Sequence, residues 1–114
     1  MKISEKDRRA LGIIRATAKC NMEILEVQSR LGLLPRRLRD STKGKRLRKI
    51  FAKRDELEDK TIGENPRATD ARFVNLATNR RNIYLKAFLS LRKESETLIT
   101  ELESTAWRNE HPVS

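Results

Sequence analysis

The chain has 114 residues, of which 37% are hydrophobic and 37% charged, and its formal net charge at pH 7 is +10. A chain of this length can bury one modest core, which leaves no room for a separate catalytic domain. Its single cysteine excludes an internal disulfide and a cysteine-rich metal site. We therefore expect one all-α domain over residues 1–114, a small bundle of three to four helices with a long C-terminal helix of coiled-coil character.

The sequence predicts neither a secretory signal peptide nor a membrane-spanning helix. Residues 1–7 lack the apolar core of a signal peptide, and no apolar run is long enough to cross a bilayer. The most basic segment also lacks the Trp, Phe and Leu face that membrane-surface helices insert. We expect a cytoplasmic protein without a membrane partner.

A first helix is predicted over about residues 4–31. Ser4 can cap it, and Asp7 stands three residues later, where an acidic side chain reaches back to free amides. Apolar positions recur every three or four residues and predict a face wide enough to touch two neighbours. These positions are Ala10, Ile13, Thr17, Cys20, Ile24, Val27 and Leu31. Gly32 predicts a helix end in the left-handed conformation.

A basic segment and a second helix follow over about residues 35–60. Pro35 predicts the first residue of a short helical turn. The second helix should begin near Thr42, with Leu47, Ile50, Phe51 and Leu57 as its apolar side. Gly63 and Asn65-Pro66 predict a loop before the last helix.

The last helix is predicted over about residues 66–107, with a loose tail at 108–114. Its seam consists of Val74, Ala77, Arg81, Tyr84, Phe88, Leu91, Ser95, Leu98 and Leu102. About forty residues give a helix of roughly 60 Å, longer than its neighbours can cover. We expect the projecting part to carry a self-association surface of Leu98, Ile99, Leu102 and Trp107. The alternative is a kink near Ser90 or Ser95 that folds the end back.

The densest positive charge lies between Arg36 and Arg54, a segment that contains ten basic residues and one acid, Asp40. So many like charges repel one another unless a polyanion binds them. We predict phosphate contacts from Arg36, Arg37, Arg39, Lys43, Lys45, Arg46, Arg48, Lys49 and Lys53. The alternative is a highly soluble helix with solvated side chains.

A second candidate surface is a polar stripe on the last helix, where no carboxylate occurs between Asp70 and Glu94. Asparagine is a poor helix former, but it can hydrogen-bond phosphates, sugars or base edges. The stripe comprises Arg72, Asn75, Asn79, Asn82, Lys86 and Lys93. The alternative is the polar face of an ordinary bundle helix.

Two groups of acidic residues, nine of the 16 in the chain, suggest partners for the basic residues. Residues 94–114 contain five glutamates and one arginine, so this stretch should meet either a basic patch of a neighbouring subunit or solvent. Asp55, Glu56, Glu58 and Asp59 should pair with Arg80 and Arg81. A metal site at these acids is disfavoured, because no matching carboxylate pair or well-placed histidine occurs elsewhere.

Catalysis finds little support in the sequence. The four glycines are scattered and form no phosphate-binding loop. Cys20 lies within an apolar seam and has no histidine near it in sequence, so a buried thiol is expected rather than a nucleophile. Trp107 could stack on a base or on a partner. No cofactor is expected.

These patterns predict a non-enzymatic, basic, helical nucleic-acid-binding protein. It would act as an accessory or architectural subunit, for example of a ribonucleoprotein, and would contact mainly the phosphate backbone of RNA or DNA. The alternative is a helical adaptor or assembly factor whose basic face docks on an acidic protein. The sequence leaves both interpretations open.

Overall fold

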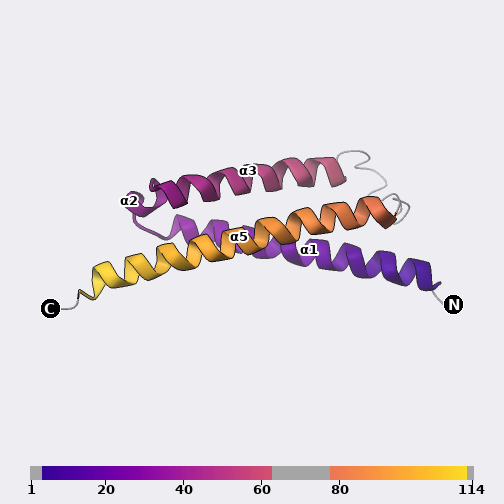
Figure 1. Ribbon diagram of the computed structural model, residues 1–114, viewed down its shortest axis with the longest axis horizontal. Coiled ribbons are helices and arrows are strands. Elements are labelled where there is room, and N and C mark those ends of the chain that lie inside the picture. Colours follow the sequence, from indigo (N-terminus) through magenta and orange to yellow (C-terminus); the bar gives the residue numbers. More distant parts are fainter. Residues whose placement is uncertain (1–3, 63–77, 113–114) are drawn as a thin grey trace.

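The computed structural model describes residues 4–62 and 78–112, and within these ranges the chain forms four helices and no strand. The helices are α1 (Glu5–Gly32), α2 (Arg36–Arg39), α3 (Thr42–Ile62) and α5 (Thr78–Glu110). Helix α3 runs antiparallel to α1 and α5, which are parallel to each other (Figure 1). The predicted all-α bundle with a long C-terminal helix is confirmed.

The core lies along the line where α1, α3 and α5 meet. Each helix contributes one apolar stripe at helical spacing, as the sequence pattern predicts. The most deeply buried side chains include Ile24 and Val27 of α1, Leu47 of α3, and Phe88 and Ile99 of α5. Ser95 is also fully buried, and its hydroxyl donates to the Arg92 carbonyl at 2.9 Å. This bond satisfies the one polar side chain at the centre of the α5 stripe.

Helix α1 ends differently from the sequence prediction. Gly32 is its last residue, but no glycine in the described part of the chain has a positive φ. The end is instead tightened by bonds from the Leu33 amide to the Arg30 carbonyl (3.2 Å) and from the Leu34 amide to the Leu31 carbonyl (3.1 Å). Pro35 follows, and the residue before a proline is driven out of the helical conformation. The proline therefore explains the helix end better than the glycine does.

Helix α5 is one uninterrupted helix, so a kink at Ser90 or Ser95 does not occur. It continues to Glu110, which places residues 108–110 in the helix rather than in a tail. Its last turns extend beyond α1 and α2 at one end of the molecule (Figure 1). The predicted part before Thr78, residues 66–77, lies outside the described residues.

The predicted self-association surface is wrong for two of its four residues. Ile99 and Leu102 are 0% and 3% exposed, because they pack in the core of their own chain. Leu98 is half-buried against the same core, and only Trp107 is largely exposed, at 59%. The sequence predicts that the C-terminal half of the last helix projects beyond its neighbours. In the structure, the C-terminal part of α1, ending at Leu31, and Leu38 of α2 belong to the same core and reach this half.

No helix of the described ranges is long and apolar enough to span a lipid bilayer.

The start of α3 packs closely against α2. The Gly44 amide donates to the Ser41 hydroxyl at 3.2 Å, which satisfies one amide of the first turn. Gly44 itself is buried, and a Cβ there would lie 2.7 Å from the Leu38 carbonyl oxygen and 2.6 Å from the Arg39 carbonyl carbon. Only glycine allows this backbone approach.

We predict opposite effects for alanine at two helical glycines. Gly44→Ala should destabilise the protein by about 1–3 kcal/mol, because the new methyl group overlaps backbone atoms. Gly12→Ala should stabilise it by roughly 0.5–1 kcal/mol, because a Cβ at Gly12 meets nothing within 4 Å and alanine is the better helix former. Urea unfolding followed by circular dichroism measures both, and a stabilising Gly44→Ala would contradict the described junction.

Candidate nucleic-acid interface

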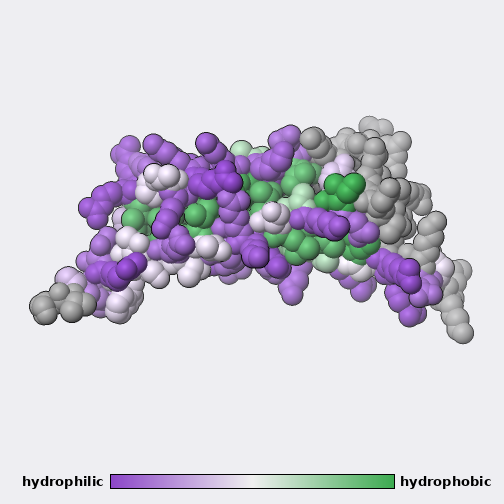
Figure 2. Space-filling view, viewed as in Figure 1, coloured by the Kyte–Doolittle hydropathy of each residue, from purple (hydrophilic) through white to green (hydrophobic). Residues whose placement is uncertain are grey.

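The basic residues of α2 and α3 point outward because the opposite side of α3 is buried. Gly44, Leu47, Ile50 and Leu57 face the core, so the side chains between them face solvent. We call the exposed cations of these two helices the basic ridge. It comprises Arg36, Arg37, Lys43, Lys45, Arg46, Arg48, Lys49 and Lys53. Figure 2 shows hydrophilic residues over α2 and the first turns of α3, and hydrophobic residues along the line between α3 and α5.

Two arginines of the segment are not part of this surface. Arg39 is only half-exposed, and its buried Nε has no hydrogen-bond partner among the described residues. Arg54 is 7% exposed and donates to Asn21 of α1 at 2.8 Å, while it also pairs with Asp55 and Glu58. Arg54 therefore attaches α3 to α1. The sequence contained one signal for this role: Arg54 is a basic residue at a position that the apolar spacing of α3 places on its buried side.

Asp40, which follows α2, and Glu56 of α3 pair with three members of the basic ridge. Asp40 accepts ion pairs from Arg36 at 3.5 Å and from Arg48 at 3.0 Å, and Glu56 pairs with Lys53 at 3.6 Å. All these side chains are about half-exposed or more. Exposed pairs of this kind contribute little stability and are screened by salt. The cations are therefore still accessible to another anion.

Helix α5 pairs with two further members of the ridge. Arg46 Nε lies 2.6 Å from Glu94 Oε1, and Lys43 Nζ lies 2.8 Å from Glu101 Oε2. The acidic C-terminal stretch thus meets basic residues of its own chain, which corrects the expectation that it faces another subunit or solvent alone. Four of its five glutamates are paired in this way, two with α3 and two with α1.

Three members of the ridge have no carboxylate partner. Arg37, Lys45 and Lys49 are exposed and make no ion pair with any residue in the described ranges. Lys45 and Lys49 stand one helical turn apart on the outer face of α3, about 6 Å along its axis. Two of the three unpaired cations therefore lie on this face of α3 and the third, Arg37, on α2, and phosphate binding by them stays a prediction.

The asparagine stripe is only partly visible. Arg72 and Asn75 do not belong to the described residues. Asn79 lies in α5, but the structure does not describe its side chain. Asn82, Lys86 and Lys93 are exposed on α5. Lys93 directly precedes Glu94, which pairs with α3, and neighbouring residues of a helix point about 100° apart. The described stripe therefore lies about a quarter of a turn around α5 from the glutamate that contacts the basic ridge. The side chains of Arg80 and Arg81 also lie outside the described part.

A second set of ion pairs fixes the register of α1 against α5. Arg30 donates to Glu103 and, at 3.3 Å, to Glu96, while Arg92 of α5 donates to Glu23 of α1 at 3.2 Å. The hydrogen bond to Glu103, opposed by burial and supported by the charges of Glu103 and Glu96, raises the pKa of Arg30 above its ordinary value. The guanidinium stays charged and holds two turns of α5 at once. Sequence reasoning missed this role of Arg30.

The His, Cys, Asp and Glu side chains of the described ranges bear on the metal and thiol predictions. No group of three or more His, Cys, Asp or Glu side chains in the described ranges is placed to bind a metal ion. Cys20 is buried, with the guanidinium Nη1 of Arg92 3.8 Å from its sulfur. The thiol belongs to the buried core, as the seam predicts, and lies beside one charged group at its rim.

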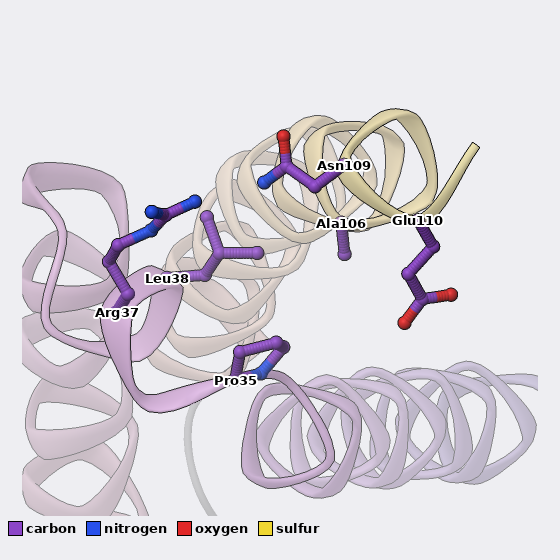
Figure 3. Close-up of a pocket in the computed structure, with 6 residues that line it drawn as sticks. All are labelled: Pro35, Arg37, Leu38, Ala106, Asn109 and Glu110. Atoms are coloured by element: carbon purple, nitrogen blue, oxygen red, sulfur yellow. The ribbon is translucent and has the colours of Figure 1, made fainter. Parts of the chain in front are cut away.

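A pocket of about 360 Å³ lies between α2 and the last turns of α5. In the close-up, Leu38 points toward α5 and Asn109 lies on the same side as Arg37, while the Glu110 carboxylate points away from Arg37 (Figure 3). The remaining lining residues are Pro35 and Ala106. The lining offers few polar groups that converge on one point, so it does not have the character of a small-molecule site.

Comparison of the chain with protein-family models, with curated proteins and with solved structures finds no match. Function is therefore argued from the geometry and charge of this chain.

We predict that Arg30→Lys destabilises the protein by about 1–2 kcal/mol, although it preserves the charge. A lysine ammonium lacks the planar fork that reaches two carboxylates, so charged hydrogen bonds are lost. Arg15→Lys is the matched control, because Arg15 is exposed on α1 and makes no ion pair in the described part of the chain. Its effect should stay within 0.5 kcal/mol. Equal unfolding midpoints in urea for the two variants would contradict the assigned role.

Proposed function

We propose that this protein binds the phosphate backbone of RNA or DNA through the basic ridge, as a non-enzymatic accessory or architectural subunit. The observation that carries the proposal is the outer face of α3, where Lys45 and Lys49 are exposed and unpaired within the described ranges. No acid occurs in the chain from Ser41 to Arg54, so the carboxylates of the ridge all lie at its edges. A phosphate backbone approaching this face meets cations first.

The spacing of the ridge suits a nucleic-acid strand. Lys43 and Lys53 are ten residues apart, which is about 15 Å along a helix. A duplex strand places one phosphate per roughly 3.4 Å of its axis, so about four phosphates face this distance. The ridge can therefore contact several consecutive phosphates without bending the helix. Such contacts hold a protein on the backbone but do not read sequence.

The aromatic side chains support backbone contact rather than base stacking. Phe51 and Phe88 are buried and Tyr84 is half-buried. Trp107 is exposed, but its ring already stacks on His111, with centroids 4.5 Å apart and planes 17° apart. Binding of single strands without sequence preference usually uses several exposed aromatic rings. The described surface offers no such platform, so duplex and structured RNA or DNA are the favoured ligands.

The direct test is fluorescence anisotropy with labelled duplex DNA, single-stranded DNA and RNA at 50 mM and 200 mM salt. We expect binding at 50 mM that weakens steeply at 200 mM, because phosphate contacts release counterions. No binding to any of the three at 50 mM would contradict the proposal. That result would favour the alternative, a basic face that docks on an acidic protein. A cytoplasmic location and membership of a larger ribonucleoprotein belong to the same proposal.

Neutralising the unpaired lysines should locate the contact surface. Lys45→Gln with Lys49→Gln should weaken duplex binding about tenfold at 50 mM salt and reduce the slope of log K against log salt by about 1.8, since each lost phosphate contact contributes roughly 0.9. The control is Arg15→Gln with Lys19→Gln, which removes the same charge at the same spacing from the exposed side of α1. Its slope should equal that of the unaltered protein. Equal losses in the two variants would mean that net charge alone drives binding.

A further inference from the structure

Two glutamates of α5 occupy the edge of the basic ridge that faces α5. Glu94 and Glu101 are seven residues apart and therefore lie on one side of α5. Opposite them, Lys43 and Arg46 are three residues apart on α3, and the two pairs close at 2.8 Å and 2.6 Å. These are the lengths of charge-assisted hydrogen bonds. Each carboxylate thus binds its cation as a phosphate oxygen would.

Both pairs stay open to solvent. The Arg46 and Lys43 side chains are 56% and 50% exposed, and those of Glu94 and Glu101 are 38% and 46% exposed. Exchange of a carboxylate for another anion at these cations needs no opening of the core. Leu47 and Ile50, which lie between α3 and the rest of the bundle, are buried and take no part in these ion pairs.

The two pairs differ from the ion pairs that fix the fold. Arg54, in the core, is held by three partners, and Arg30, 30% exposed, is held by two carboxylates. Lys43 and Arg46 each have one carboxylate partner and sit at the rim of the apolar contact. Exposed single pairs contribute little to stability. A contribution to fold stability therefore does not by itself explain why acidic residues occupy positions 94 and 101.

We infer that Glu94 and Glu101 are intramolecular competitors of phosphate groups for two cations of the basic ridge, Lys43 and Arg46. The inference rests on the proposed function and concerns how strongly the same surface binds. In the unbound protein the two carboxylates neutralise Lys43 and Arg46, which leaves Arg37, Lys45 and Lys49 as the first contacts. Binding through Lys43 and Arg46 requires a phosphate to displace a carboxylate that is held at high effective concentration. The carboxylates thereby limit affinity for any polyanion.

The test is the double variant Glu94→Gln with Glu101→Gln, measured by anisotropy on a labelled duplex. We expect about tenfold tighter binding at 50 mM salt and a salt slope steeper by up to about 1.8, because two more cations become available to phosphates. The matched control is Glu26→Gln with Asp59→Asn. It makes the same change in net charge at exposed acids that form no ion pair in the described part of the chain. The control should bind less than threefold tighter, with an unchanged slope.

A second variant excludes an effect of altered folding. Adding Lys43→Gln and Arg46→Gln to the Glu94→Gln, Glu101→Gln protein should abolish the gain in affinity and return the slope to that of the unaltered protein. Thermal unfolding of each variant checks that the bundle is intact. If the gain persists without Lys43 and Arg46, the competitor role is wrong.

The outcomes separate this inference from the proposed function. If the unaltered protein binds and the Glu94→Gln, Glu101→Gln variant binds no tighter than its control, the inference fails and the proposed function stands. If only the Glu94→Gln, Glu101→Gln variant binds, the competition is complete and the inference is supported. If no variant binds any nucleic acid at 50 mM salt, both fail.

Discussion

The buried side of α3 is the constraint on which the rest of the structure depends. Leu47, Ile50 and Phe51 pack into the core, and Gly44 brings the helix close to α2. A helix fixed on one side by these contacts cannot rotate, so the charged residues between them are held facing outward. Fixing the helix in this way avoids the entropy loss of ordering its backbone when the exposed side chains bind an extended anion. The core therefore fixes the direction in which α3 presents its basic residues, and the face on which each lysine lies follows from the apolar spacing.

Charge in this protein is used in two ways. Between α1 and α5, half-buried pairs around Arg30 and Arg92 fix the register of two parallel helices that share no short connection. Along α3, exposed pairs leave the cations accessible to solvent and to other anions. Burial separates the two uses, since an ion pair gains strength and specificity as water is removed from it. The acidic end of α5 takes part in both.

The helical fold, the apolar seams and the outward direction of the basic residues could be predicted from the sequence, because they depend on local spacing. That helices of the same chain bury Ile99 and Leu102 could not be predicted, since it depends on how far a neighbouring helix reaches. For the same reason the partners of the glutamates were missed: Arg30 and Glu103 are 73 residues apart, and nothing local signals their contact. The interface was thus predicted as a list of cations, and the structure adds which of them carboxylates already hold. Nucleic-acid binding by Arg72, Asn75 and Asn79 remains a prediction.

The most direct measurement is chemical-shift mapping by two-dimensional NMR of the labelled protein titrated with a short duplex. The central claim is that cations held on the outer face of α3 form the contact surface. It predicts shift changes concentrated at residues 36–53, strongest near Lys45 and Lys49, with Arg15 and Lys19 of α1 unaffected. Changes spread evenly over α1, α3 and α5, or centred on α1, would contradict it.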